Sequence, residues 1–379
     1  MNNNKFKTKK KGGRIELLKT YKIKNLKSFN RDFIEIVKSK GITNINLIKI
    51  DHNMILISTN DTLYLLYFNN NLKIKYIDSK KFNNEIRFIE FIDPNNIVIV
   101  YNNRIEVVNL TNNNLAYFYN SSITITSNNH ISGLNLNNKM YLCYVNKSTV
   151  QLEVISNKSQ NSNSKTFYDG KNYSIIKVRL VHNNQDSMYL VSMVKDDDNN
   201  YLLVIQNLNR NSEPFEHNIS QFSNKVHDFD CLFDNNKMYI TLILDKGEYY
   251  ENSGLVMIAY DPYIRSNDTP INVMYFGKVG KSEKSNNSES LEIIHLNTHI
   301  SKIIVFNSKY IVIQKKFSDK YLYLIINHPL ENKEFSWRIY EIKKNDNDIR
   351  LFNLIFFNKE SLILSLYNEK HNYLDTLIH

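Results

Sequence analysis

One pattern of strands and turns recurs along the chain and constrains its fold more than any other feature. In residues 89–119, three apolar runs are separated by Asn-Asn pairs. Each unit has an apolar strand, a tight polar turn, a strongly apolar strand, another polar turn and a third strand. The turn residues Asn, Asp and Ser bond to their own backbone and tolerate left-handed geometry. Seven copies occupy residues 45–68, 86–110, 131–155, 178–205, 229–260, 300–326 and 349–378.

The burial expected of each strand follows from its pattern. The middle strand of a unit is nearly all apolar, as in residues 97–100 and 239–242, so we expect it to be buried on both faces. A fourth, more polar run follows each of the first six copies. In residues 72–77 of this kind, Lys73 and Lys75 alternate with apolar residues, which suits an outer strand where lysines discourage edge-to-edge pairing.

These strands predict an all-β fold, a single β-propeller of seven four-stranded blades. The seventh copy has no fourth strand after it, and the unassigned strand at about 14–23 is expected to close the ring by pairing into the last blade. Residues 24–43 fit either a short helix or a linking strand. The alternative fold is a set of β-sandwich domains, which show no regular four-strand repeat. The predicted units are a flexible basic arm at 1–13 and the propeller at 14–379, with blades starting near 44, 86, 131, 174, 226, 292 and 348.

In this blade rhythm the chain resembles the WD-repeat-like β-propeller superfamily over residues 14–379. The signature residues of that superfamily are absent. The single tryptophan, Trp337, is not followed by the Asp that ends a typical blade, and the Gly12-Gly13 pair lies in the arm. The resemblance implies a propeller that serves as an interaction platform, and it assigns no subfamily.

Composition predicts a folded intracellular protein. Apolar residues make up 42% of the chain and aromatic residues 12%, which is enough for a large core. Cys143 and Cys231 lie inside apolar runs and are expected to be buried thiols. The N-terminus has no apolar signal region, and no apolar stretch reaches the ~20 residues of a membrane span. We therefore expect a cytoplasmic or nuclear location. The abundance of Asn follows the A/T-rich codons of an AT-rich genome and carries no functional signal.

Positive charge is concentrated at the N-terminus. The net charge is +10, and residues 1–31 hold eleven Lys or Arg and one acidic residue, so the rest of the chain is balanced. Such a cluster is typical of a nuclear localisation signal or a nucleic-acid patch, and a solvated tail is the alternative. Few aromatics lie among the cations, which favours non-specific nucleic-acid binding. The candidate residues for nucleic acid or an acidic partner are Lys5, Lys7, Lys9, Lys10, Lys11 and Arg14.

Two motifs resemble nucleotide or metal sites and fail on their spacing. Gly280-Lys281-Ser282 would end a phosphate-binding loop, but Tyr275 stands where the first glycine is needed. His295 and His299 are four residues apart without the glutamate of a zinc-protease helix, and they precede a predicted strand. A solvated loop and surface histidines are the predicted structures.

Two acidic segments complete the candidates. The Asp-rich residues 196–200 fit an exposed hairpin tip better than a calcium loop. Residues 227–230, HDFD, begin an inner strand near the predicted channel, where polar side chains either bind a ligand or tie one blade to the next. No catalytic, cofactor or metal site is predicted from the sequence.

The leading hypothesis is a non-catalytic propeller scaffold for protein partners, a monomer within a larger complex. Contact sites are expected on the loops that outgrow the repeat, at 156–165, 246–253 and 278–290. One alternative is a nucleic-acid-associated factor tethered by its basic arm. Another is an enzyme or ligand binder that uses the central channel. No cofactor or membrane association is expected.

Overall fold

The computed structural model describes most of the chain between residues 32 and 378. The described residues are 32–33, 35–37, 39–42, 47–51, 54–69, 73–110, 115–119, 123–137, 139–156, 159–168, 171–183, 187–210, 213–221, 225–234, 236–244, 255–263, 271–276, 301–306, 310–316, 320–327, 336–343, 353–358, 361–368 and 373–378. The predicted arm at 1–13 and the predicted closing strand at 14–23 lie outside them.

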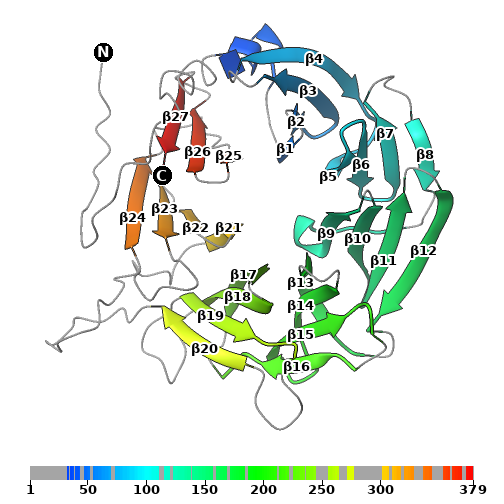
Figure 1. Cartoon of the computed structure of the whole chain (residues 1–379), viewed down its shortest axis with the longest axis vertical. Helices are drawn as coiled ribbons and strands as arrows, with labels where there is room; N and C mark the ends of the chain where they lie inside the picture. Colours follow the sequence, from blue (N-terminus) through cyan, green and yellow to red (C-terminus); the bar gives the residue numbers. More distant parts are fainter. Residues whose placement is uncertain are drawn as a thin grey trace, which may run out of the picture.

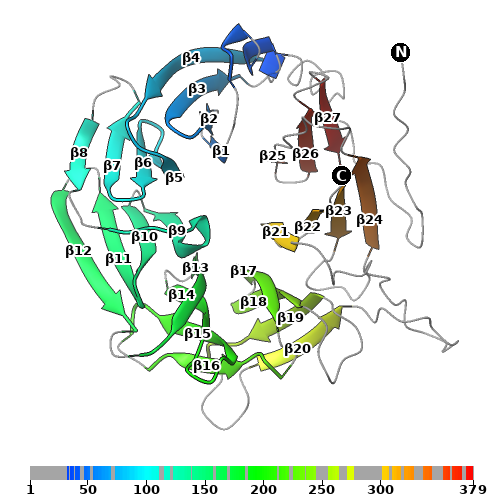
Figure 2. The same ribbon diagram turned by 180° about the vertical axis from the view of Figure 1, so that it is seen from behind.

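The described strands form seven antiparallel sheets set around one centre (Figures 1 and 2). Six sheets have four strands and one has three, and within each the strands pair in chain order. The prediction of an all-β propeller of four-stranded sheets is confirmed, and the sandwich alternative is wrong because the sheets stand radially rather than in two layers.

We number the sheets as blades 1 to 7 in chain order. Blades 1 to 3 contain β1 (Leu47–Asp51), β2 (Met54–Ser58), β3 (Thr62–Phe68), β4 (Ile74–Lys81), β5 (Ile86–Asp93), β6 (Asn96–Tyr101), β7 (Ile105–Asn109), β8 (Leu115–Tyr119), β9 (Ile131–Leu136), β10 (Lys139–Asn146), β11 (Thr149–Ser156) and β12 (Ser159–Phe167). Blades 4 and 5 contain β13 (Ser174–His182), β14 (Met188–Lys195), β15 (Tyr201–Asn207), β16 (Phe215–Asn218), β17 (Val226–Asp234), β18 (Lys237–Leu244), β19 (Leu255–Tyr260) and β20 (Ile271–Phe276). Blades 6 and 7 contain β21 (Ser301–Phe306), β22 (Tyr310–Lys316), β23 (Lys320–Asn327), β24 (Ser336–Lys343), β25 (Asn353–Asn358), β26 (Ser361–Asn368) and β27 (Tyr373–Ile378). A single 3-10 turn, Asn128–His130, precedes β9 in this part of the chain.

The first strand of each blade is innermost. These inner strands contact one another in the order β1, β5, β9, β13, β17 and β21, and β1 also contacts β25 of blade 7. The first and last described blades are therefore neighbours around the centre (Figure 1).

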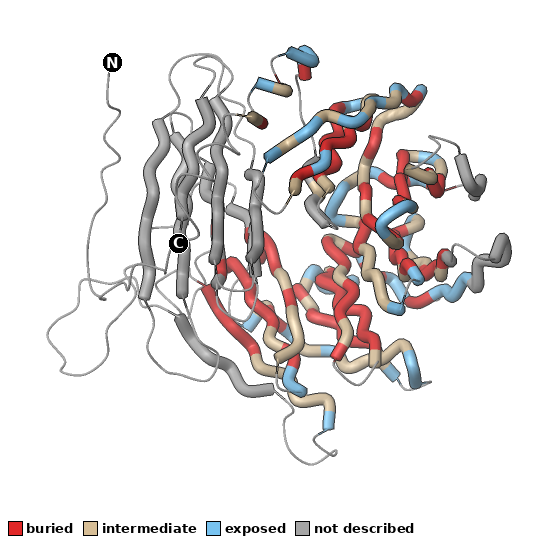
Figure 3. Tube along the Cα trace, turned by 45° about the horizontal axis from the view of Figure 1, so that its top comes forward, coloured by how far each residue is buried: buried red, intermediate tan, exposed pale blue. Residues whose placement is uncertain are grey.

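The hydrophobic core lies between neighbouring blades rather than inside one of them. Figure 3 shows buried residues, in red, along strands of several neighbouring blades. Ile97 and Ile99 of β6 belong to the cluster that contains Leu56 of blade 1. Val98, which points to the opposite face, belongs to the cluster that contains Leu142 of blade 3. A strand that is buried on both faces has to be largely apolar, and this explains the long apolar runs of the middle strands.

Outer strands such as β4 are polar because only part of their surface is covered. Along β4, half-buried and exposed side chains alternate from Ile74 to Lys81. The same principle corrects one prediction: residues 159–165, expected to be a loop, belong to β12, the outer strand of blade 3. β12 pairs with β11, for example Gln151 with Thr166. The sequence of β12, SQNSNSKTF, lacks the apolar alternation that signals a half-buried strand, so the strand was not recognised from the sequence.

A short helix precedes the first blade, which decides between the two structures considered for residues 24–43. The described residues between 32 and 39 are helical, and Phe33 and Val37 are almost fully buried. Gly41 ends the helix with a φ of 60°, and the N–H of Ile42 donates to the carbonyl of Val37 at 2.9 Å. This is the glycine-terminated cap that ends many helices.

Asparagine provides the left-handed residue in several hairpins, as the turn chemistry predicts. Asn137, Asn199 and Asn236 lie between paired strands with φ values of 53°, 62° and 65°. Lys147 occupies the same region, with a φ of 57°, in the turn between β10 and β11. Lysine lacks the short polar side chain by which asparagine bonds to its local backbone, so this conformation is unfavourable for it.

Replacing Lys147 by asparagine is therefore expected to stabilise the protein by about 0.5 kcal/mol, because asparagine tolerates left-handed geometry. Denaturant unfolding at neutral pH measures the gain. Lys139→Asn is the matched control, since Lys139 is also exposed but lies at the extended start of β10. An equal effect of the two substitutions would show that the turn conformation is not the cause.

Candidate functional site

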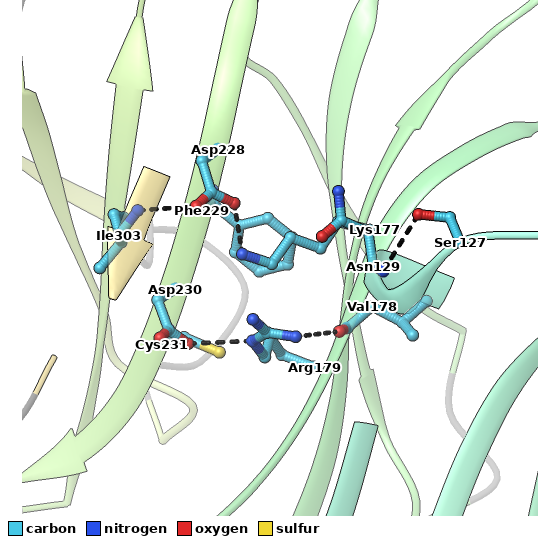
Figure 4. A network of polar contacts seen from close by, with 10 residues as sticks. All are labelled: Ser127, Asn129, Lys177, Val178, Arg179, Asp228, Phe229, Asp230, Cys231 and Ile303. Carbon is cyan, nitrogen blue, oxygen red and sulfur yellow. Dashed lines mark hydrogen bonds and ion pairs between the residues drawn. The ribbon is translucent and has the colours of Figure 1, made fainter. Parts of the chain in front are cut away.

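A network of polar contacts joins the inner strands of blades 4, 5 and 6 (Figure 4). Asp228 of β17 is its centre. One carboxylate oxygen, Oδ1, accepts from the ammonium group of Lys177 on β13 and from the backbone N–H of Phe229. The other oxygen, Oδ2, accepts from the backbone N–H of Ile303 on β21 at 2.8 Å. One carboxylate therefore holds three blades together.

A second ion pair runs beside the first. Arg179 and Asp230 lie two residues beyond Lys177 and Asp228 on the same strands, and side chains two apart in a strand share a face. The Nε atom of Arg179 donates to Oδ1 of Asp230 at 3.2 Å, and its Nη1 donates to the carbonyl of Val178 at 3.2 Å. The side chains of Arg179 and Asp230 are about a quarter exposed, at 26% and 24%, whereas those of Lys177 and Asp228 are buried.

Burial controls the electrostatics of the inner pair. It lowers the pKa of Lys177, and the nearby positive charge of Arg179 lowers that pKa further, while Asp228 opposes both effects. The ammonium group also lies 5.4 Å from the ring centroid of Phe229, close enough for a cation–π contact. This buried ion pair therefore connects neighbouring blades and stabilises the ring. Removing either partner would leave the other as a buried charge without a counter-charge.

Polar bridges also connect the other described inner strands. Lys49 of β1 pairs with Glu90 of β5 at 2.6 Å, from Nζ to Oε2. The side-chain amide of Asn135 on β9 donates to the carbonyl of Ile92 near the end of β5 at 2.5 Å. Between β9 and β13, Ser132 Oγ accepts from the backbone N–H of Leu180 at 3.0 Å. Each successive pair of inner strands from blade 1 to blade 6 thus has at least one such bridge.

A second kind of polar pair is buried within blades 2 and 3. Tyr101 donates its hydroxyl hydrogen to Oε2 of Glu106 at 2.8 Å, and Oε1 of that carboxylate pairs with Nε of Arg104 at 2.8 Å. In blade 3, Tyr144 donates to Oε1 of Glu153 at 2.6 Å. In both blades the tyrosine lies two residues beyond the cross-strand partner of the glutamate, so the pair is a repeated feature.

The two pairs differ in charge balance. The position of Arg104, two residues before the glutamate, holds the neutral Gln151 in blade 3. Burial raises the pKa of Glu153, although its hydrogen bond from Tyr144 works in the opposite direction. The Oε2 atom of Glu153 has no hydrogen-bond partner among the described residues. Burial also raises the pKa of Tyr101, and the Glu106 carboxylate raises it further.

The acidic segments predicted from the sequence have structural roles. Residues 227–230 do lie on an inner strand, and Asp228 and Asp230 tie one blade to the next. The Asp-rich residues 196–200 form the turn between β14 and β15, where Asp196 Oδ1 accepts from the backbone N–H of Asn200 at 2.8 Å. Within the described part of the chain, no group of His, Cys, Asp or Glu could hold a metal ion.

Other predicted sites lie partly or wholly outside the described residues. This holds for the six cations of the arm, for Gly280 and for both histidines of 295–299. The loops 246–253 and 278–290 lie there as well. Cys143 and Cys231 are described, and both are free and buried, as predicted. Burial raises the pKa of Cys143 to about 12, so its thiol is protonated at neutral pH.

The roles of Lys177, Arg179 and the Tyr–Glu pairs were not predicted from the sequence. A usable signal was present for the first two. Both lie in the apolar inner strand IIKVRLV, and each is 51 residues before its acidic partner in the following repeat. Opposite charges at one repeat position therefore mark the contact between blades.

The strand order identifies the architecture. Four-stranded antiparallel sheets stand radially around one centre, and the first strand of each is innermost. The chain folds as a β-propeller. None of its described helices is long and apolar enough to cross a membrane.

No family model and no curated protein sequence matches the chain. Among solved structures, it is similar to Hsv2 of Kluyveromyces lactis, with 10% identity, a TM-score of 0.46, and coverage of 79% of this chain and 86% of that one. It is also similar to the WD40 domain of SCAP from fission yeast, with 11% identity, a TM-score of 0.48, and coverage of 88% and 84%. The Pan2 WD40 domain of Neurospora crassa shares 8% identity, with a TM-score of 0.45 and coverage of 88% of both chains.

Proposed function

We propose that this propeller is a non-catalytic scaffold that binds protein partners on its loops and outer surfaces. The observation that carries the proposal is the series of polar bridges between inner strands from blade 1 to blade 6. They hold neighbouring blades in a fixed arrangement, and binding concentrates on loops that a rigid scaffold presents. The step from a propeller to a scaffold is an analogy between folds.

The use of charge in the centre supports a non-catalytic role. A general acid or base has to reach a substrate, yet six charged groups of the described inner strands form three ion pairs with one another. Lys49 pairs with Glu90, Lys177 with Asp228, and Arg179 with Asp230. Groups used in this way stabilise the ring instead of reacting.

We also propose that the protein works in the cytoplasm or nucleus, as one propeller within a larger complex. Its two free, buried cysteines suit a reducing compartment. The loops 246–253 and 278–290 remain proposed contact sites because they outgrow the repeat.

The basic arm supports a second candidate function, a nucleic-acid-associated factor. The whole excess of positive charge falls within residues 1–31. Lys5, Lys7, Lys9, Lys10, Lys11 and Arg14 would bind phosphates without base recognition. If all six engage, affinity falls with salt at a log–log slope of about −5.

Affinity purification from source-cell lysate tests both functions. The full-length protein is compared with a variant that lacks residues 1–13, each with and without nuclease. A scaffold is expected to retain the same discrete set of proteins in all four samples. A set that disappears after nuclease treatment or truncation would instead assign the function to the arm. The absence of any discrete set would refute the scaffold.

A further inference from the structure

The outer part of blade 1 exposes large apolar side chains. Among the described residues, the exposed large hydrophobic side chains are Tyr67 at 40%, Ile77 at 49% and Tyr263 at 46%. Two of the three lie on the paired strands β3 and β4, at the outer edge of one blade. Single exposed apolar residues are normal, but neighbouring ones on adjacent strands form a surface that a partner can cover.

Strand pairing places these side chains beside lysines. Tyr67 is the cross-strand partner of Lys75, so both side chains stand on one face of the sheet. A β-bulge follows, because Leu66 pairs with Tyr76 while Leu65 pairs with Asp78. Ile77 is the extra residue of this bulge. Bulges redirect side chains, which accounts for an isoleucine that faces solvent.

Positive charge dominates this edge. Between residues 73 and 81 there are four lysines, Lys73, Lys75, Lys80 and Lys81, and one acidic residue, Asp78. Lys40 adds a further cation, since its ammonium group lies 4.1 Å from the ring centroid of Tyr76. Lys81 pairs with Asp61 at 3.5 Å, and this ion pair joins two exposed side chains and is therefore weak.

Among the described strands, β4 has a partner on one side only. β4 is the last strand in the order β1–β2–β3–β4. In Figures 1 and 2 it runs along the outside of the ring, and the short helix lies near the start of the strand. The edge strand of a sheet can accept an extended segment of another chain.

The chemistry of this edge selects its occupant. A second copy of the same edge would bring like charges together, which disfavours self-association. Nucleic acid would use the lysines and stack on Tyr67, but it gains little from an aliphatic side chain such as Ile77. An acidic protein segment with apolar residues uses all of these groups.

We propose that the outer edge of blade 1 is a docking site for an extended acidic segment of a partner protein. Its carboxylates pair with Lys73, Lys75 and Lys81, and its apolar side chains cover Tyr67 and Ile77. This inference rests on the proposed scaffold function and specifies one surface for it. The same lysines repel a second copy of this edge and attract the acidic partner, and both effects make binding more specific.

Selection from a displayed library of random 12-residue peptides tests the proposal, with the full-length protein as bait. Enrichment of sequences that combine Asp or Glu with large apolar residues is expected. Synthetic copies of the enriched peptides should bind about tenfold more weakly to Ile77→Ser and to the double variant Lys73→Glu/Lys75→Glu. Thermal unfolding verifies that each variant is folded.

Matched variants separate this site from other surfaces. Tyr263→Ser removes the other exposed aromatic, and Lys139→Glu/Lys237→Glu reverses two exposed lysines elsewhere; neither should weaken binding. Neutralising the six arm cations, Lys5 to Arg14, should also leave binding unchanged. Peptides without acidic residues, no enrichment, or equal binding by Ile77→Ser would overturn the proposal.

Binding of a labelled single-stranded 20-nucleotide RNA is the last measurement of the test. Binding that is lost in Lys73→Glu/Lys75→Glu and kept in Ile77→Ser would assign the edge to nucleic acid and overturn the peptide site. The scaffold function fails separately, through loss of the purified partner set. If that set persists with Ile77→Ser while no acidic peptide binds, the docking site alone is wrong.

Discussion

Replacing Asp228 by alanine is expected to lower the free energy of unfolding by about 3–5 kcal/mol, because it removes one partner of a buried ion pair. The variant leaves the Lys177 ammonium group and the Ile303 N–H without their acceptor, in positions where water does not replace it. Chemical denaturation at pH 7, followed by circular dichroism, measures the loss.

The neighbouring pair provides an internal control. Asp230 lies on the same strand and pairs with Arg179, but both side chains are about a quarter exposed. Asp230→Ala is expected to cost about 1 kcal/mol or less, as for most partly exposed ion pairs. A cost for Asp228→Ala no greater than that of Asp230→Ala would refute the role of Asp228 as a tie between three blades.

A double variant separates burial from charge. Lys177→Met combined with Asp228→Leu removes both charges and fills similar volumes. It should recover a large part of the loss, because well-packed apolar residues often replace a buried ion pair without net cost. Recovery will be incomplete, since the N–H of Ile303 still lacks its acceptor.

The pH dependence of the alanine variant follows from Lys177. Burial and Arg179 already lower the pKa of Lys177, and loss of Asp228 lowers it further. A lysine with a lowered folded-state pKa destabilises the fold while the unfolded chain is protonated. This penalty is relieved as the pH rises toward 10.5, the ordinary pKa of lysine. The stability deficit of Asp228→Ala relative to wild type should therefore shrink between pH 7 and pH 10.

How much of this could be predicted from the sequence depends on the range of each interaction. The strand pattern and the burial of the middle strands are local, and both were predictable. The left-handed asparagines followed in the same way from turn chemistry. The outer strand β12 was not predictable, because a partly covered strand leaves no apolar alternation to detect.

The polar ties were harder to predict because their partners are distant in sequence. Lys177 and Asp228 are 51 residues apart, and Ile303 is 75 residues beyond Asp228. Asp228 accepts from the backbone N–H of Ile303, so the residue type at position 303 does not indicate this bond. Residues 227–230 were recognised as either ligand groups or ties, and only the position of β13 decides between them. Pairing of charges across repeats is the signal that sequence analysis can use in other propellers.

Glutamine substitutions at the two buried glutamates are expected to have opposite effects. Glu106→Gln should destabilise the protein by about 1–3 kcal/mol, because Arg104 loses its charged partner in a poorly solvated site. Glu153→Gln should stabilise it by about 1 kcal/mol at neutral pH, because the neutral amide still accepts from Tyr144 and no ion has to be buried. Thermal and denaturant unfolding of both variants compares the same substitution at equivalent positions of two blades.

The pH dependence distinguishes this explanation from a packing effect. Burial raises the pKa of Glu153 above 4.5, its ordinary value. The stability that protonated Glu153 contributes to the wild-type protein is therefore fully present below pH 4.5, and it is lost as the pH rises through the folded-state pKa. The advantage of Glu153→Gln should therefore be smallest near pH 4 and should grow toward pH 7. An advantage that is constant with pH would mean that packing causes it. If both glutamines destabilise the protein equally, the neutral Gln151 does not matter, and the difference in charge balance between blades 2 and 3 has no energetic consequence.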